Sequence, residues 1–540
     1  MRHSCAIILY LCLAVVCNLK TYGQTTVNPD SLASDFSYLV KQLELTHPDP
    51  YSGFGGKVFF HKQAFDLTND IRRNKYTTQQ FFDKISAFLA NLNDGHTLLI
   101  RPNTGERNKA SLFPIVAKVI PDELIIRGVL PENKVFLGSR ILGVNGVSTD
   151  SLLKAVGTLK ACENIYGQYS LLNTYLSHSD FILKLFPETK DKIYLNIETP
   201  DGIKTDIPIP LLSMDTLKKC PKAQLPRWDV IPTNYMSYQF MDKAKDIMLL
   251  KLTRVMAREN FETMIHGNWP KSYEQMRQFY KQTLSKEMPT DTAEALNGLP
   301  SFSETFYQML TEMKKEKART LIIDLRGNGG GWTPITLPSL YQLFGDKYIE
   351  TDMDTRFYRL LSPLYLLKTN QSLEEFNQGH NSEFQLGDYT FEEDRPDTAS
   401  IITKRKYFIE NCMSDTKPKL EKQQGKPVYT PENIYVVTDE RTFSAAFHYA
   451  FYLWKMGATI VGIPCMQAPN TFMEQTPFQL PYTQLNGSIS NSMQIFLPPN
   501  DRRAKTFWPD LMPTYDDYKR YQFDIHSEIR YLLDQIEQKK

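Results

Sequence analysis

The sequence predicts an α/β protein built from several domains. Its 540 residues suffice for two to four domains, each with its own core. Three patterns support this class: helical periodicity near the amino end, short strands with turns in the middle, and strand–turn–helix units toward the carboxyl end. The expected domains are a helical one (24–110), a β-rich one (111–212) and a larger one (213–540) that carries an insertion or lid (345–430).

Composition excludes several classes of protein. A hydrophobic content of 41% and a charged content of 23% are typical of a globular chain. Lysine and arginine number 62 against 61 aspartates and glutamates, so the net charge of +1 predicts no surface for polyanions. We find no Lys/Arg run suited to nucleic acid and no internal repeat. Nucleic-acid binding is therefore excluded as an expected function.

The amino terminus is typical of a targeting segment. Arg2 and His3 precede an uncharged run, residues 5–17, that is too short to span a bilayer as a mature helix. Small residues before Gln24 fit signal-peptidase cleavage, so residues 1–23 are the expected signal peptide. We therefore expect export to the periplasm or the extracellular space. Lipid attachment at Cys17 is the alternative, although the preceding residues lack the small side chain usually found there.

The mature chain carries no pattern for a transmembrane helix, a metal or a cofactor. No later segment has 18 uninterrupted apolar residues. Its four cysteines are far apart and form no Cys-x-x-Cys pair, which argues against a structural zinc site and a disulfide scaffold; they are Cys162, Cys220, Cys412 and Cys465. One or two disulfides stay open, with no pairing indicated. We expect no metal and no cofactor.

One histidine stands at a corner in the helical region. A helix predicted from Thr77 or Thr78 ends in turn residues, and Asn93-Asp94-Gly95 deliver His96 just before the apolar run 98–100. An earlier helix, capped by Asp30 or Ser31, ends at His47-Pro48. A histidine at such a corner is commonly structural. Of the nine histidines, His96 is nevertheless the one best placed for display in a cleft.

Short strands dominate residues 111–212. Ile115–Ile120, Glu123–Val129 and Ser139–Val144 alternate with turns, and Asn145-Gly146 is a tight hairpin turn. The run 137–148 resembles the PDZ fold, whose members bind extended peptide ends by adding a strand. Another small β-rich module is the alternative.

A glycine-rich turn follows a buried strand in the carboxyl-terminal region. The strand expected at Asp246–Leu252 is followed by mixed helical material, with 253–298 polar and irregular, and a helix is expected from Ser303 through Met313. The strand Thr320–Leu325 then runs into Arg326-Gly327-Asn328-Gly329-Gly330-Gly331. Consecutive glycines let the backbone approach a partner closely and turn its N–H groups outward. Both phosphate-loop spacings, Gly-x-Gly-x-x-Gly and Gly-x-x-x-x-Gly-Lys-Ser/Thr, are absent.

A second strand–turn–helix unit presents a serine. Ile434–Val437 reads as a buried strand, residues 438–441 as a polar connector, and a helix is expected from Ala445. Ser444 therefore lies at a helix start and at the carboxyl end of a strand, where free N–H groups and the helix dipole favour negative charge. An acyl-transfer nucleophile needs such donors. The alternative is an ordinary helix N-cap.

The order of these pieces resembles the tail-specific (C-terminal processing) protease family, closer to its tricorn-like branch, which uses histidine. The resemblance covers nearly the whole mature chain and rests on Asp94-Gly95-His96-Thr97, the PDZ-like module, Asp324-Leu325-Arg326-x-Asn328-x-Gly330-Gly331 and Thr442-Phe443-Ser444-Ala445-Ala446. It implies a crotonase/ClpP-like α/β spiral catalytic domain and a serine endopeptidase acting on polypeptides, and the sequence leaves an oligomer open. It also implies Ser444 as nucleophile and an oxyanion hole from the N–H of Ala445 and that of Gly329 or Gly330.

Two departures from the family pattern bear on mechanism. The processing branch uses a lysine after the nucleophile helix, but residues 465–471 hold none, and Lys455 lies inside that helix. His96 is therefore the favoured base. Phe447 stands where the family often has glutamate. This departure keeps open a catalytically weak or inactive peptide-binding relative as the alternative function.

The remaining roles are less specific. Asp510, in a Pro-Asp pair, is the expected acid that orients His96, with Glu474 and Asp501 as alternatives. His448, one helical turn after Ser444, is a rival base, but we expect it to pack within its helix. An esterase or amidase of α/β-hydrolase type is disfavoured, because the serine lacks the flanking glycines of that nucleophile elbow.

Overall fold

The structure is a computed structural model that describes residues 26–102, 111–232, 234–269, 271–392, 399–412 and 416–539. The expected signal peptide lies outside the described residues. The chain divides into two compact units. Unit 1 comprises residues 1–225, 355–393 and 466–507, and unit 2 comprises 226–354, 394–465 and 508–540. Part of the stretch expected to be a lid thus belongs to unit 1, while the glycine-rich turn and Ser444 belong to unit 2.

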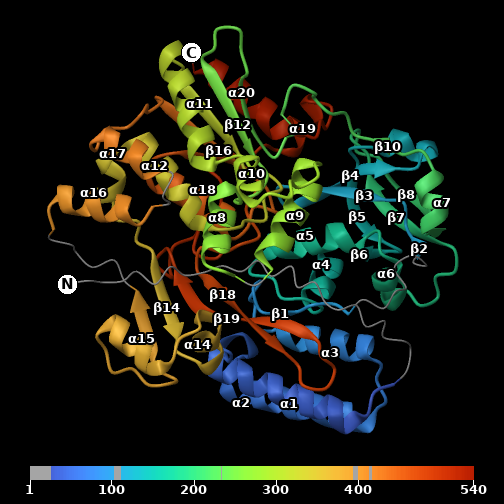
Figure 1. Ribbon diagram of the computed structural model, residues 1–540. Coiled ribbons are helices and arrows are strands. Elements are labelled where there is room, and N and C mark those ends of the chain that lie inside the picture. Colours follow the sequence, from blue (N-terminus) through green and yellow to red (C-terminus); the bar gives the residue numbers. More distant parts are fainter. Residues whose placement is uncertain are drawn as a thin grey trace. The chain divides into compact units, whose positions relative to one another are not determined.

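Helices open unit 1, as predicted. Asn28, not Asp30 or Ser31, caps the first, since its side chain accepts from Asp30 N, and Thr77 with Gln80 forms a capping box on the third. Apolar positions at helical spacing are buried in a core shared with strand residues such as Phe478 and Ile489. These helices, blue in Figure 1, are α1 (Pro29–Thr46), α2 (Lys57–Arg73) and α3 (Thr78–Ala90).

A five-stranded sheet of unit 1 joins distant parts of the sequence. Its order is β1-β19-β14-β15, with β18 also paired to β19. The strands are β1 (Leu98–Leu99), β14 (Arg356–Leu360), β15 (Tyr389–Glu392), β18 (Thr471–Gln479) and β19 (Asn486–Ile495), and α14 (Pro363–Thr369) and α15 (Leu373–His380) lie between β14 and β15 in the chain. A buried ion pair, Arg359 Nη2 to Glu474 Oε1 at 3.0 Å, joins β14 to β18.

A seven-stranded sheet forms the β-rich part of unit 1. Its order is β10-β4-β5-β7-β8, with β3 paired to β4 and β6 to β5. Asn145 (φ 49°) and Gly146 (φ 81°) make the predicted hairpin turn with both central residues left-handed. The strands are β3 (Val116–Ile120), β4 (Glu123–Val129), β5 (Arg140–Val144), β6 (Val147–Ser148), β7 (Lys192–Glu198), β8 (Lys204–Pro210) and β10 (Ala223–Gln224). A separate pair is β2 (Ser111–Leu112) with β9 (Leu212–Ser213), and the helices of this part are α4 (Thr149–Gly157), α5 (Ile165–Tyr175), α6 (Ser179–Leu185) and α7 (Met214–Lys219).

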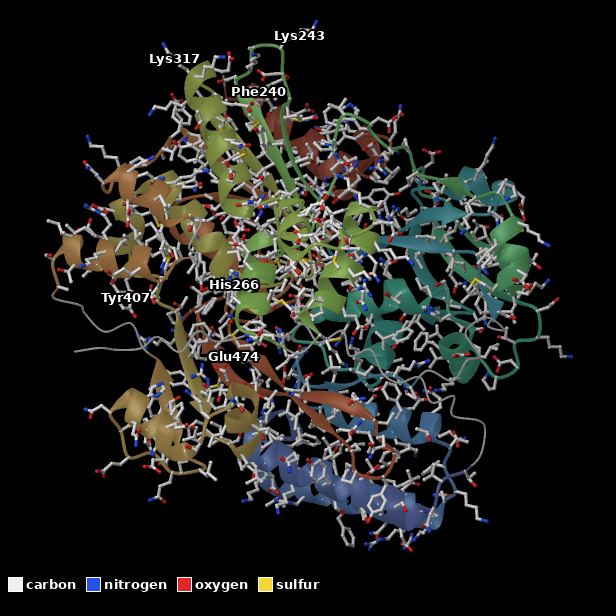
Figure 2. The ribbon with its side chains drawn as sticks, in the orientation of Figure 1. Phe240, Lys243, His266, Lys317, Tyr407 and Glu474 are labelled. Carbon is white, nitrogen blue, oxygen red and sulfur yellow. The ribbon has the colours of Figure 1, made fainter. Side chains whose placement is uncertain are left out.

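The sheet of unit 2 positions the glycine-rich turn beside the serine. Its order is β11-β12-β13-β16-β17, parallel except for the edge strand β11. The strands are β11 (Met236–Phe240), β12 (Ile247–Leu252), β13 (Thr320–Asp324), β16 (Asn433–Thr438) and β17 (Thr459–Gly462). The turn between β11 and β12 exposes Lys243 (Figure 2). Because β13 and β16 are adjacent and parallel, the segments that follow them leave the sheet at the same edge.

The helices of unit 2 refine one expectation. Segment 253–298, expected to be irregular with mixed helical material, contains three α-helices among its described residues, with a core around Phe261, Met276 and Tyr280. Its apolar residues are too sparse for periodicity to reveal them, and tertiary packing decides the outcome. The helices are α8 (Arg258–His266), α9 (Ser272–Phe279), α10 (Thr292–Asn297), α11 (Phe302–Glu316), α12 (Leu337–Phe344), α13 (Asp346–Glu350), α16 (Ile401–Glu410), α17 (Lys417–Gln423), α18 (Ala445–Lys455), α19 (Tyr515–Arg520) and α20 (Ser527–Gln538).

Two further features bear on the sequence expectations. Among the helices of the described residues, none is both long and apolar enough to cross a membrane. Four cysteines of the described residues are free thiols, namely Cys162, Cys220, Cys412 and Cys465. The disulfides that the sequence left open are therefore not formed between them.

We predict that Phe36→Ala strongly destabilises unit 1. Phe36 is fully buried and meets Phe88 edge to face, with ring centroids 5.1 Å apart. Truncating a buried phenylalanine costs about 3–5 kcal/mol through lost burial and the cavity left behind. The free energy of unfolding in urea measures this effect. Val58→Ala, at a side chain that is 78% exposed, is the matched control, and its change should stay within about 0.5 kcal/mol.

Candidate active site

Ser444 occupies a strained turn between β16 and α18. Its backbone has φ 53° and ψ −127°, a conformation that costs a non-glycine residue on the order of 1–3 kcal/mol. Its side chain makes no capping hydrogen bond to the helix, so the N-cap alternative does not explain the serine. This is the sharp strand-to-helix geometry in which a nucleophile is presented. Here the elbow forms without flanking glycines.

The glycine-rich turn packs directly against the serine turn. Phe443 N donates to Asn328 O (3.0 Å), and Thr442 Oγ1 donates to Leu325 O (3.1 Å). A Cβ added at Gly330 (φ 99°) would lie 2.7 Å from both Phe443 O and Ser444 Cβ and 2.9 Å from Ala445 N. Only glycine permits this approach. The structure thus brings together Ser444, Ala445 and the glycine turn.

Asn328 shapes the glycine turn from inside. This fully buried side chain donates from Nδ2 to Leu252 O (3.0 Å) and accepts from Gly330 N at Oδ1 (2.9 Å). The N–H of Gly330 is thereby already used within the turn. Among the described residues, no acceptor is found for the N–H of Gly329 or for that of Ala445, the first residue of α18. These two donors are the ones available to an oxyanion.

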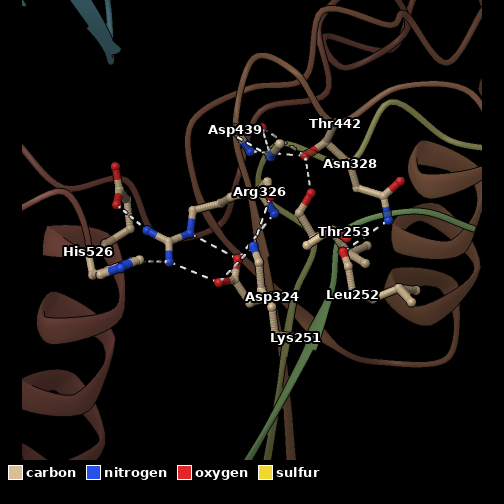
Figure 3. Close-up of polar contacts among 12 residues, drawn as sticks. Lys251, Leu252, Thr253, Asp324, Arg326, Asn328, Asp439, Thr442 and His526 are labelled. Atoms are coloured by element: carbon tan, nitrogen blue, oxygen red, sulfur yellow. Dashed lines mark hydrogen bonds and ion pairs between the residues drawn. The ribbon is translucent and has the colours of Figure 1, made fainter. Parts of the chain in front are cut away.

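Asp439 ties the two turns together through hydrogen bonds. Gly327 N donates to both carboxylate oxygens, each at 2.9 Å, and Arg441 N donates to Oδ1 at 3.0 Å. Thr442 Oγ1 donates to the same Oδ1 at 3.2 Å. Burial raises the pKa of Asp439, and the Gly327 N–H opposes that rise. One carboxylate therefore spans from the glycine turn to the serine turn (Figure 3).

Buried charges surround the carboxyl end of β13. Asp324 is fully buried and pairs with Arg326 Nη2 (2.9 Å) and Lys251 Nζ (3.1 Å). Burial alone would raise the pKa of Asp324, but these two cations hold it well below its usual range. Arg326 reaches onward to the last helix, where Nη1 donates to Glu528 Oε2 (2.6 Å) and Nη2 lies 3.0 Å from His526 Nδ1 (Figure 3).

His96 lies in the predicted corner of unit 1, between α3 and β1. Its backbone N donates to Asp94 Oδ1 (2.8 Å), and its carbonyl accepts from Ser488 Oγ (2.9 Å) and Gln475 Nε2 (3.2 Å). Asp94 Oδ2 in turn lies 3.2 Å from His47 Nε2, both side chains being fully buried. Burial would raise the pKa of Asp94, but His47 and the other partners lower it to about 2. The corner is thus held by an ionised aspartate.

Glu163 is the carboxylate that unit 1 places beside the imidazole. Its Oε1 lies 3.7 Å from His96 Nδ1, and its oxygens accept from Gly95 N (3.3 Å) and Ala468 N (2.8 Å). Burial lowers the pKa of His96, but the nearby carboxylate of Glu163 outweighs it, and the net shift is upward. Sequence reasoning missed Glu163. Its one signal is an acid directly before Asn164, which caps α5.

The same cluster has the composition of a metal site. Asp94, His96 and Glu163 each offer a ligand atom, and these atoms lie within 4.8 Å of one another. Both carboxylates, however, already accept backbone N–H groups, and Asp94 also pairs with His47. A cation would have to displace these partners. We therefore assign the cluster to a hydrogen-bonded network, and the absence of a metal stays a prediction.

The other sequence candidates have local partners. Asp510 Oδ2 accepts from Ile460 N (2.8 Å) in unit 2, so its role as the orienting acid stays a prediction. Glu474 is committed to Arg359. Asp501 Oδ1 accepts from Arg503 N (2.7 Å) in an exposed turn. His448 Nδ1 lies 2.9 Å from Thr333 Oγ1, and Lys455 pairs with Asp354, as expected of side chains that serve packing.

Comparison with known proteins decides the family of the carboxyl-terminal region. Residues 295–510 match the model of Peptidase family S41. The chain carries a peptidase family S41 domain. The protein is therefore a serine-type peptidase, and the resemblance predicted from sequence is confirmed at the level of this family. The S41 domain includes the glycine turn, Ser444 and Asp510.

Solved structures similar to this chain show the same overall fold. The crystal structure of mature CPAF is 13% identical, with a TM-score of 0.52 over 94% of this chain and 98% of that one. Mature CPAF complexed with lactacystin is 14% identical, with a TM-score of 0.51 over 94% and 99%. At such identity the similarity shows the fold alone, and it confirms the predicted α/β multidomain class. No curated protein matches the sequence.

We predict that the two neighbouring glycines of the turn differ sharply in tolerance. Gly330→Ala forces a Cβ against the serine turn at a left-handed φ and should cost at least about 1–3 kcal/mol. Gly329→Ala is the matched control, because a Cβ there meets nothing within 4 Å. Thermal and urea unfolding of both variants measure the difference. Equal stability of the two variants would contradict the packing described here.

Proposed function

We propose that this serine peptidase is an exported endopeptidase whose nucleophile is Ser444 and whose general base is His96. The observation that carries the proposal is Ser444 itself. It lies within the S41 match, in a strained turn at a helix start, without a capping role and against a glycine turn with outward N–H groups.

We assign Glu163 as the acid that orients His96, in place of Asp510. Its position on the Nδ1 side of the ring supports this assignment, because a base that is oriented at Nδ1 takes the serine proton at Nε2. The carboxylate also stabilises the imidazolium that forms when the proton arrives. Use of a histidine rather than a lysine supports assignment to the tricorn-like branch.

We assign the oxyanion hole to the N–H groups of Ala445 and Gly329. Gly330 had an equal claim from sequence, but its N–H is engaged by Asn328 Oδ1. Gly330 instead provides the close approach that brings the turn onto Ser444. The proposed sequence of steps is attack by Ser444 Oγ on a peptide carbonyl, accumulation of charge facing the two donors, and release of the acyl group to water.

The remaining parts of the proposal rest on the sequence. The segment 1–23 supports export, with lipid attachment at Cys17 as the minor route. The seven-stranded sheet, with its hairpin at residues 144–147, supports a PDZ-like module that binds extended polypeptide. Segments of unfolded or terminal polypeptide are the proposed substrates.

We predict that Ser444→Ala abolishes both peptide hydrolysis and labelling by a fluorophosphonate. Loss of a triad nucleophile lowers kcat by at least about 10³-fold. Casein digestion and labelling of the purified protein measure the effect, with Ser490→Ala as a hydroxyl control in unit 1. Wild-type protein that binds peptides but takes no label would instead be the non-catalytic relative. Cleavage of short-chain esters without casein digestion would favour an esterase.

We predict that Glu163→Gln shifts the acid limb of the kcat/KM profile to lower pH. The base works only when unprotonated, and Glu163 raises the pKa of His96, so removing the charge lowers that pKa. The plateau should also fall by about 10²- to 10⁴-fold, since a neutral amide neither fixes the required tautomer of the ring nor stabilises the imidazolium. Asp510→Asn is the decisive comparison. If that variant moves the limb and Glu163→Gln does not, Asp510 is the orienting acid.

A further inference from the structure

One peptide unit at the start of the glycine turn is held entirely by side chains. Arg326 N donates to Asp324 Oδ1 (3.1 Å), and Arg326 O accepts from Lys251 Nζ (2.9 Å). The next backbone group, Gly327 N, donates to both oxygens of Asp439. Three consecutive backbone groups are therefore bound by three charged residues that come from three neighbouring strands or their ends (Figure 3).

Packing does not hold this peptide. Gly327 is exposed, and a Cβ added there would meet nothing within 4 Å. Its φ of 75° is open to glycine at little cost, as are alternative φ values. Rotation of the Arg326–Gly327 peptide plane would carry the carbonyl toward Asp439 and the N–H away from it. The turn is closed by Asn328 N donating to Leu325 O (3.0 Å), and within it the charged side chains favour the observed orientation of the central peptide.

The orientation matters because Gly329 follows two residues later. A rotated peptide plane at Gly327 redirects the turn that presents the Gly329 N–H, while α18 keeps the Ala445 N–H in place. An oxyanion donor acts through its fixed position, and its loss costs about 10²- to 10³-fold in kcat. Asp439 also holds Arg441 N and Thr442 Oγ1, so the same carboxylate sets the glycine turn relative to the serine turn.

We propose that Lys251 and Asp439 are positioning residues that clamp the Arg326–Gly327 peptide plane from its two sides and so preorganise the Gly329 N–H. This inference rests on the proposed function. In the proposed mechanism, neither Lys251 nor Asp439 contacts the reacting atoms. Lys251 holds the carbonyl, Asp439 holds the N–H, and Asp324 and Arg326 neutralise the charges that this arrangement buries.

The test uses Lys251→Met, Asp439→Asn and the double variant in the full chain. Each single variant should lower kcat at least about tenfold and leave KM within about twofold, because the clamp acts on the transition state. The double variant should be no slower than the slower single variant, since both substitutions release the same peptide plane. Lys245→Met and Asp246→Asn are the matched controls, from ion pairs with Glu316 and Arg319 at the other end of the sheet.

Hydrogen–deuterium exchange over residues 325–332 provides a readout that does not need catalysis. Lys251 makes no contact with the Gly327 N–H, so faster exchange of this amide in Lys251→Met requires the plane to move. Unchanged exchange in that variant, or kcat losses that multiply in the double variant, would overturn the inference. Failure of the proposed function is seen separately, as the absence of fluorophosphonate labelling at Ser444 in the wild type.

Discussion

The parallel pairing of β13 with β16 is the constraint on which the active-site geometry of unit 2 depends. It sets Asp324 beside Val437, so the chain leaves both strands at one edge of the sheet. The glycine turn follows one strand and the serine turn follows the other. Backbone hydrogen bonds between the turns then continue this pairing beyond the sheet, as from Phe443 N to Asn328 O. The helix dipole of α18 points its positive end at the same place.

This arrangement of the two turns buries several charged side chains. Asp324, Arg326 and Glu528 are all nearly inaccessible to water, and an unpaired charge in such a position is strongly destabilising. Each is therefore compensated, and the chain of partners runs from Lys251 on β12 to the start of α20. The last helix of the protein thus contributes to the position of a turn some two hundred residues earlier in the sequence (528 − 326 = 202). This network holds the turn through side chains that lie on the inner side of the sheet's carboxyl end.

In unit 1, buried carboxylates set the ionisation state of a buried histidine, His96. Two carboxylates lie near His96 and have separate tasks. Asp94, ionised down to about pH 2 by its pairing with His47, fixes the corner through the backbone, whereas Glu163 lies beside Nδ1 and raises the pKa of the ring. Stability from the raised pKa of His96 is present at low pH and is lost as pH rises through that pKa. The stability that comes from the lowered pKa of Asp94 has the opposite pH dependence. It is present at neutral pH and is lost only in strong acid.

The sequence by itself determined the elements that carry local signals. Continuous β-branched runs marked β13 and β16, turn residues marked the His96 corner, and the glycine run and the serine at a helix start marked the two turns of the S41 domain. Period and turn chemistry are written in neighbouring residues, so they can be read without the fold. The bounds of the helices in 253–298 were not predicted, because their apolar residues acquire a partner only through tertiary packing.

Only the tertiary structure decided which carboxylate approaches His96 and which glycine keeps a free N–H. Glu163 carries no motif, and its role comes from a chain path that returns to the corner after the intervening strands. In the sequence, Asn328 resembles an ordinary turn residue. In the structure its side chain accepts from the Gly330 N–H, so this N–H cannot also donate to an oxyanion. Both facts concern single hydrogen bonds between residues far apart in sequence or hidden inside a turn. Hydrogen bonds of that kind depend on positions to within a fraction of an ångström, and no periodicity in the sequence encodes them.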